Sequence, residues 1–124
     1  MAKKIMIVDD SRIAQLQLQE ILAEAGYEVA ACCQNGEDAL SQYDQVHPDL
    51  VTMDIVMPGI DGLDAARLLL QAHPEARVLM ISSLAYDTTI NEALRIGAKG
   101  FVYKPFAREQ VMEAIQGAFA GKAE

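Results

Sequence analysis

The chain has 124 residues with 52% hydrophobic content, and its formal net charge at pH 7 is -8. Length and composition predict one domain over residues 1–124 with a single core, while the negative charge and the lack of a basic stripe argue against nucleic acid as a direct ligand. No apolar run approaches the length of a membrane span or of a signal-peptide core, so we expect no membrane insertion.

Short apolar runs alternate with segments of helical spacing from the start of the chain. The first run, Ile5–Val8, predicts a buried strand that stops at two aspartates. Ser11 then predicts a helix N-cap, and Gly26 predicts the end of that helix. A second strand is expected at Val29–Cys33, followed by a turn at Asn35-Gly36 and a second helix.

The same alternation continues through the second half of the chain. A third strand is expected at Leu50–Met53 and a fourth at Val78–Ile81, and the helix between them ends at His73-Pro74. A helix over Thr88–Ile96 leads to the last predicted strand, Phe101–Tyr103.

The last helix is expected to fray at Gly121. The five strand–helix repeats predict a doubly wound α/β fold with a five-stranded parallel sheet. Right-handed crossovers place the carboxyl ends of all strands at one edge of the sheet. Four of the five strands end in polar or charged residues, namely Asp9 with Asp10, Asp54, Ser82 and Lys104. We expect these side chains to converge on one crevice, where such sheets bind ligands.

The two cysteines, Cys32 and Cys33, are neighbours on a predicted strand, so their side chains should point to opposite faces of the sheet. A disulfide between them is therefore not expected. A chain without disulfides suits a reducing compartment, and we expect a cytoplasmic protein.

The residues at the strand ends combine a nucleophile with groups that bind anions and cations. Three carboxylates placed together repel one another unless a cation neutralises them, and oxygen ligands from few carboxylates suit Mg²⁺. Lys104 can reach a carboxylate or a phosphate as a point charge, and Ser82 offers a hydroxyl. The set predicts phosphoryl transfer, in which Asp54 attacks phosphorus and forms an acyl phosphate. The alternative is a structural cluster in which Lys104 pairs with Asp54 and no chemistry occurs.

The sequence resembles the response-regulator receiver domains of two-component signalling, in particular those of the single-domain chemotaxis type. The resemblance covers essentially the whole chain. The motifs that carry it are Val8-Asp9-Asp10, Met53-Asp54 with residues 57–62, Ile81-Ser82, residues 97–101 and Lys104-Pro105-Phe106. It implies a flavodoxin-like (βα)5 fold with strand order 2-1-3-4-5.

The resemblance also implies roles for the residues of the site. Asp54 is expected to accept the phosphoryl group, and Lys104 to bind phosphate. Asp10, Asp54 and the backbone carbonyl of Val56 are expected to bind Mg²⁺ directly, and Asp9 through water. A cis peptide bond is expected between Lys104 and Pro105.

A switch pair is implied as well, consisting of the Ser82 hydroxyl and the Phe101 ring, although simple core packing explains Phe101 equally well. Relatives often carry tyrosine at position 101, whereas Phe101 lacks the hydroxyl that such a tyrosine would use in a hydrogen bond. Val56 and Leu84 are apolar where many relatives carry polar side chains near the phosphate, which predicts slow loss of phosphate.

The leading hypothesis is thus a monomeric signalling switch, not a dedicated enzyme, that accepts phosphate from a histidine kinase. Because the sequence leaves no room for an output domain after Gly121, output is expected through contact with a target protein, for which the flagellar motor switch is one candidate. A separate phosphatase is a further expected partner. The expected contact surface is the helix over Thr88–Ile96, the strand Phe101–Tyr103 and the start of the last helix, with Tyr103 partly exposed.

Two other functions compete with this hypothesis. A Mg²⁺-dependent aspartyl phosphatase of the haloacid-dehalogenase type also uses a nucleophilic aspartate at a strand end. Such an enzyme needs a second aspartate two residues later, where this chain has Val56. The other candidate is a binding module that is never phosphorylated.

Overall fold

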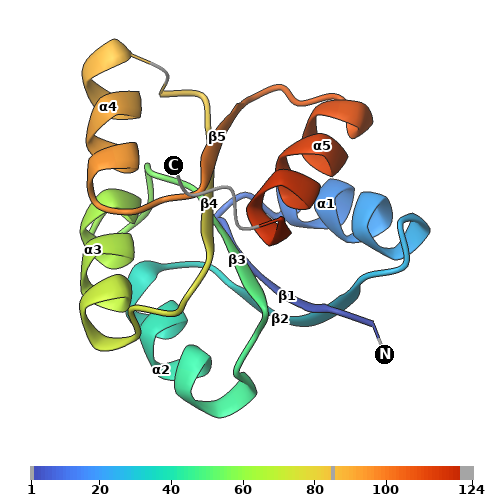
Figure 1. Cartoon of the computed structure of the whole chain (residues 1–124), viewed down its shortest axis with the longest axis horizontal. Coiled ribbons are helices and arrows are strands. Elements are labelled where there is room, and N and C mark those ends of the chain that lie inside the picture. The colour runs from blue at the N-terminus through green and yellow to red at the C-terminus, as the bar shows by residue number, and fades with distance from the viewer. Residues whose placement is uncertain (1, 85, 121–124) are drawn as a thin grey trace.

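The computed structural model describes residues 2–84 and 86–120, which form a parallel sheet with helices on both faces (Figure 1). The strands are β1 (Lys4–Val8), β2 (Glu28–Cys33), β3 (Leu50–Met53), β4 (Val78–Ser82) and β5 (Gly100–Tyr103). The helices are α1 (Arg12–Glu24), α2 (Gly36–Val46), α3 (Gly62–Ala72), α4 (Asp87–Arg95) and α5 (Arg108–Phe119). The sheet order is β2-β1-β3-β4-β5 and every pairing is parallel, which confirms the predicted fold class and strand order.

The predicted strands and the predicted fourth helix begin and end within one residue of the observed ones. The turn predicted at Asn35-Gly36 is wrong, because Asn35 is the N-cap of α2 and Gly36 is its first residue. A Cβ at Gly36 would lie 2.8 Å from the Cβ of Ala65, so this glycine allows α2 to start close against α3. The predicted fraying at Gly121 lies outside the described residues.

Two layers of helices enclose the sheet, each over its own apolar cluster. Figure 1 shows α2, α3 and α4 on one face and α1 with α5 on the other. The strands alternate between the two clusters, so that Leu50 packs toward α1 and α5 while Val51 and Met53 pack toward the other three helices. Cys32 and Cys33 follow the same alternation and are both free thiols, as predicted.

Short polar side chains begin three of the helices at the carboxyl edge of the sheet. Ser11 accepts a hydrogen bond from the Ala14 N–H, which confirms the predicted N-cap of α1. Asn35 and Asp61 cap α2 and α3 in the same way. These caps set the start of each helix immediately after the loop that leaves its strand.

The register of the strands decides which loop residues become neighbours. Val8 lies opposite Met53, so the next residues, Asp9 and Asp54, leave adjacent strands side by side. The Asp54 N–H donates to the Val8 carbonyl at 2.9 Å, which extends the pairing to the site itself.

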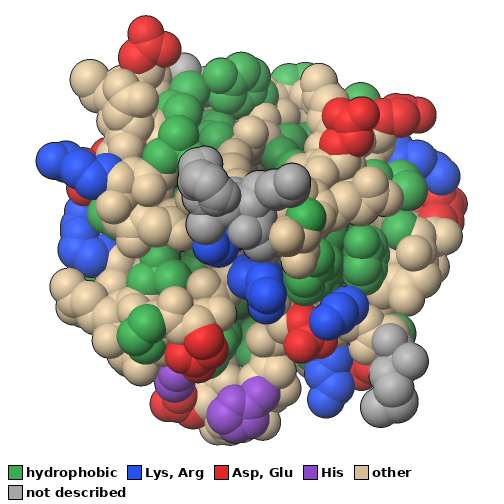
Figure 2. All heavy atoms as spheres, viewed as in Figure 1, with side chains coloured by type: hydrophobic (Ala, Val, Ile, Leu, Met, Phe, Trp, Pro, Cys, Tyr) green, Lys and Arg blue, Asp and Glu red, His purple; other side chains and the backbone are tan. Residues whose placement is uncertain are grey.

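The surface of the described residues carries both signs of charge. Figure 2 shows Lys and Arg side chains lying among Asp and Glu side chains on the face seen in Figure 1. This mixture leaves that face without a continuous basic stripe. Within the described part of the chain, the helices are all too short or too polar to cross a membrane.

Candidate functional site

Three carboxylates meet at the carboxyl edge of the sheet. Asp9 and Asp10 follow β1, Asp54 follows β3, and each offers an oxygen within 4.8 Å of the others. Asp9 is 1% exposed and Asp54 is 6% exposed, whereas Asp10 lies open to solvent. Two buried negative charges therefore sit beside a third that water can reach.

Lys104 supplies the positive charge of the site from the end of β5. Its Nζ atom lies 2.7 Å from Asp9 Oδ2 and 3.2 Å from Asp54 Oδ2. Burial would lower the pKa of the Lys104 ammonium, but the hydrogen bond to Asp9 and the charges of Asp54 and Asp9 together raise that pKa above its ordinary value. The lysine is thus cationic at neutral pH. The peptide bond from Lys104 to Pro105 is cis, as predicted.

Asp9 is held from its other side by the backbone. Its Oδ1 accepts a hydrogen bond from the Ser11 N–H at 2.9 Å. Burial raises the pKa of the Asp9 carboxyl above its ordinary value, and the hydrogen bonds from Lys104 and from Ser11 offset only part of that rise. The folded protein therefore bears a cost for keeping Asp9 ionised.

Asp54 stands at the start of a tightly closed loop. Its Oδ1 accepts a hydrogen bond from the Ile55 N–H at 2.7 Å, and the Gly62 N–H donates to the Ile55 carbonyl at 2.7 Å. A Cβ at Gly62 would lie 1.8 Å from the Asp54 carbonyl oxygen, so only glycine fits where α3 begins. Val56 is 60% exposed on this loop, and its carbonyl remains a predicted ligand.

The donor set fits Mg²⁺, which takes hard oxygen ligands and keeps several of its waters. All three groups are carboxylates, and the exposure of Asp10 leaves one side of the cluster open to water. Asp9, Asp10 and Asp54 are the residues that would hold the ion.

The predicted switch residues lie apart from the carboxylate contacts. Ser82 is fully buried at the end of β4, and its Oγ accepts a hydrogen bond from the Leu84 N–H at 3.2 Å. The Lys104 N–H donates to the Ser82 carbonyl, so the backbone of the two residues is joined. Phe101 is partly buried against the cluster under α2, α3 and α4, with its ring centroid 5.7 Å from that of Tyr103.

Gln15, a buried polar residue of α1, contacts the backbone of the site and is not among the residues predicted from the sequence. Its spacing from Leu18 and Leu22 is three and seven residues, which puts it on the apolar face of an amphipathic helix. A polar residue in that stripe was the available signal.

Comparisons with known proteins agree with this geometry. The family model described as the response regulator receiver domain matches residues 5–116. Chemotaxis protein CheY of Thermotoga maritima is 39% identical over 115 residues, and CheY of Bacillus subtilis is 41% identical over 115 residues; each alignment covers 93% of this chain and 96% of the relative. The crystal structure of the CheX-CheY-BeF3-Mg²⁺ complex from Borrelia burgdorferi has a TM-score of 0.92 at 33% identity, covering 94% of this chain and 89% of that chain.

The raised pKa of Asp9 predicts that Asp9→Asn stabilises the protein without Mg²⁺. At pH 7 we expect the free energy of unfolding to rise, because the neutral asparagine amide carries no charge that must be buried in the folded state. Because the pKa of Asp9 is raised in the folded state, the folded protein binds a proton at Asp9 more tightly than the unfolded chain does. As the pH falls through that raised pKa, the parent is protonated at Asp9, and its stability should approach that of Asp9→Asn. Urea denaturation of both proteins between pH 7 and pH 4 measures it.

Glu20→Gln is the matched control, because it removes one carboxylate from an exposed position of α1. A gain in Asp9→Asn that is equal at all pH values, or no gain at all, would contradict the assigned cost of burying Asp9.

Proposed function

Because the chain belongs to the response regulator receiver domain family, we propose that it is a phosphate-accepting switch of a two-component system, with Asp54 as the acceptor. The observation that carries this proposal is the Asp54 carboxylate at a strand end, beside Lys104 and two further carboxylates. The protein acts as one receiver domain over residues 1–124, and it is a switch and not a dedicated enzyme.

The transfer would proceed by in-line displacement. An Asp54 carboxylate oxygen forms a bond to phosphorus, the bond from phosphorus to the imidazole nitrogen of a kinase phosphohistidine breaks, and the imidazole leaves and takes up a proton from water. Lys104, already 3.2 Å from Asp54 Oδ2, stays within reach of the incoming phosphoryl oxygens. Asp10, Asp54 and the Val56 carbonyl would hold Mg²⁺ directly and Asp9 through water, and the ion when bound would neutralise charge on the carboxylates and the phosphoryl group.

A relative supports Mg²⁺ as the ion. The Borrelia burgdorferi CheY complex contains both Mg²⁺ and BeF3. The match to this chain over 94% of its length makes the same ion the first choice for the three carboxylates.

The switch would be the exchange of partners by Ser82. In this structure the Ser82 Oγ bonds to the Leu84 N–H. The hydroxyl acts there as an acceptor, and a phosphoryl group on Asp54 would offer a charged acceptor to which the same hydroxyl can donate its proton. Movement of Ser82 would change the space beside the partly buried Phe101, and the ring would then shift to a second packing.

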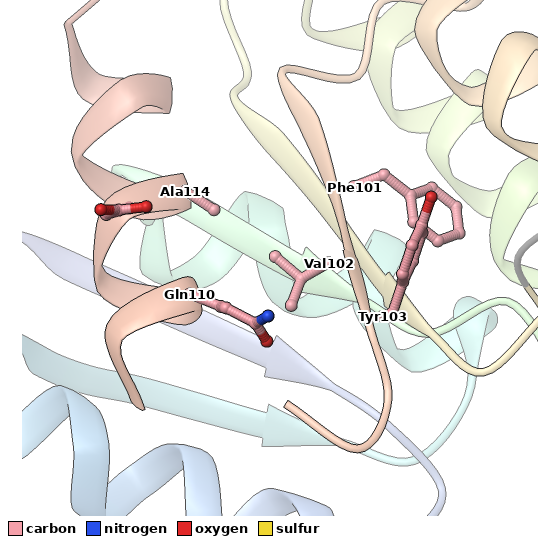
Figure 3. A pocket seen from close by; sticks show the side chains of 6 residues that line it. Phe101, Val102, Tyr103, Gln110 and Ala114 are labelled. Carbon is pink, nitrogen blue, oxygen red and sulfur yellow. The ribbon is translucent and has the colours of Figure 1, made fainter. Parts of the chain in front are cut away.

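The target protein would bind over β5 and the helices on either side of it. Figure 3 shows Val102 pointing toward α5, while Phe101 and Tyr103 lie together on the other side of the strand. Tyr103 is 54% exposed, which confirms the predicted exposure. A hollow lined by Phe101, Val102, Tyr103, Gln110, Glu113 and Ala114 runs from β5 to α5. The surface thus offers aromatic area beside polar groups, as protein-binding sites do.

The competing functions find less support in the site. An aspartyl phosphatase needs an acid–base carboxylate two residues after the nucleophile, and the exposed Val56 side chain cannot move a proton. A purely structural cluster, or a module that is never phosphorylated, also accounts for the pairing of Lys104, but the match to the receiver-domain family over residues 5–116 favours the phosphate-accepting switch.

We predict that incubation with acetyl phosphate and Mg²⁺ adds one phosphoryl group, seen as a mass increase, and that Asp54→Asn abolishes it. The variant lacks the nucleophilic oxygen but keeps the shape of the side chain. Omission of Mg²⁺ should also prevent the adduct. An undiminished adduct in Asp54→Asn would contradict the assignment, and Asp61→Asn, which changes a carboxylate at the N-cap of α3, is the control.

The phosphorylated form should be long-lived. Val56 and Leu84 are both apolar, so neither side chain can orient the attacking water, and one lost orienting hydrogen bond of about 1.4 kcal/mol corresponds to roughly tenfold in rate. We therefore expect the double variant Val56→Asn with Leu84→Glu to release phosphate about tenfold faster than the parent. Phosphate release from the purified, phosphorylated protein measures this, and equal rates would show that these side chains do not set the lifetime.

Phosphorylation should change the proposed target surface more than the far edge of the sheet. Amide hydrogen exchange with and without acetyl phosphate should show altered protection in α4, β5 and the start of α5. Helix α2 serves as the internal reference, because it lies on the same face of the sheet as α4 but near β2, the edge strand opposite β5. Changes confined to α2 or to other segments away from β5 would count against this surface.

A further inference from the structure

Gln15 is a buried amide at the edge of the proposed site, and it is 2% exposed. Its Nε2 atom donates to the Asp9 carbonyl at 2.6 Å and lies 3.3 Å from the Cys33 carbonyl. The Asp9 N–H also donates to the Cys33 carbonyl, at 2.9 Å. The Gln15 amide therefore links the backbone at the carboxyl end of β1 to that at the carboxyl end of β2.

Arg12 fixes which way this amide points. A guanidinium NH1 of Arg12 donates to Gln15 Oε1 at 2.8 Å. Because arginine has only donors, the amide oxygen must face Arg12, and the NH₂ group must face the two carbonyls. The orientation of Gln15 is thus set by the chemistry of its partners.

The carbonyl that Gln15 holds belongs to the peptide between Asp9 and Asp10. Holding its oxygen fixes the plane of that peptide, and so the direction in which the Asp10 side chain leaves the backbone. Asp10 is exposed, so its backbone decides where the carboxylate can reach. In the structure this carboxylate stays within 4.8 Å of those of Asp9 and Asp54.

We propose that Gln15 is a positioning residue for cation binding: its buried amide holds the Asp9–Asp10 peptide so that the Asp10 carboxylate faces Asp54. This inference rests on the proposed function, because it assumes that these carboxylates bind Mg²⁺. Partners that orient metal ligands contribute tenfold or more to metal affinity in other sites, which sets the scale of the effect.

The chain contains its own control for this proposal. Gln19 lies one turn later on α1, and its Nε2 donates to Cys32 Sγ at 2.9 Å, away from the Asp9 carbonyl. Removing either amide deletes a hydrogen bond between α1 and β2. Only the removal of Gln15 frees the peptide that precedes Asp10.

The test is calorimetric titration of Mg²⁺ into the parent, Gln15→Met and Gln19→Met, with urea denaturation of each to compare stability. Methionine keeps the length of glutamine and removes the amide. We expect a dissociation constant about tenfold higher for Gln15→Met and unchanged for Gln19→Met. A structural role alone would lower the urea midpoint without moving the dissociation constant, so equal affinities in the parent and Gln15→Met overturn the inference while the proposed function stands.

A measurement on the unaltered protein decides the question if Gln15→Met does not fold. Side-chain amide signals of Gln15 and Gln19 are followed by NMR during a Mg²⁺ titration. The Gln15 signals should shift with the same dissociation constant as the Asp10 backbone amide, and those of Gln19 should not. Static Gln15 signals beside a shifting Asp10 amide overturn the inference alone, whereas no response at any residue overturns Mg²⁺ binding and the inference together.

Discussion

The Lys104 ammonium between two buried carboxylates is the interaction on which the rest of the site depends. Charges leave water only where partners and hydrogen bonds compensate for lost hydration, and here one cation faces Asp9 and Asp54 at 2.7 and 3.2 Å. With Asp10 added, one positive charge stands against three negative charges. That imbalance suits the site to a divalent cation, while burial is the main reason why keeping Asp9 ionised is costly. The folded protein is thus less stable than it would be without these buried charges, which the proposed phosphoryl transfer requires.

Parallel strand pairing is what converts distant residues into neighbours. Asp9 and Asp54 are far apart along the chain, yet the pairing of Val8 with Met53 delivers both to the same edge. The pairing of Ser82 with Tyr103 likewise brings the end of β5 to this edge, so that Lys104, the next residue, lies near the carboxylates. A change of register in either pair would separate the lysine from its carboxylates, so the apolar core that sets the register also holds the site together.

The β1 and β3 side of the crevice is held more firmly than the β5 side. On the β1 side, Gln15 bonds to backbone carbonyls, and on the β3 side Gly62 packs directly against the Asp54 carbonyl. On the β5 side, Phe101 is only partly buried and Tyr103 is half-exposed. A rigid acceptor next to a looser strand is a suitable arrangement for a signalling domain, because a local change of charge can alter packing without disturbing the acceptor.

The sequence by itself determined the alternation of strands and helices, since apolar runs such as Ile5–Val8 and the caps at Ser11 and Gly26 act over a few residues. It also determined that charged groups end several strands, which made Asp54 and Lys104 candidates from their types and positions alone. Asn35-Gly36 predicts a turn from its residue types, but Gly36 begins α2, and its contact with α3, which is remote in sequence, is what requires a glycine there. Only the tertiary structure decided that Lys104 bridges Asp9 and Asp54, that Ser82 bonds to Leu84, and that Gln15 holds the Asp9 carbonyl. These contacts depend on strand register and helix docking, and no local pattern of residues encodes the distance between two side chains that meet only after the sheet has formed.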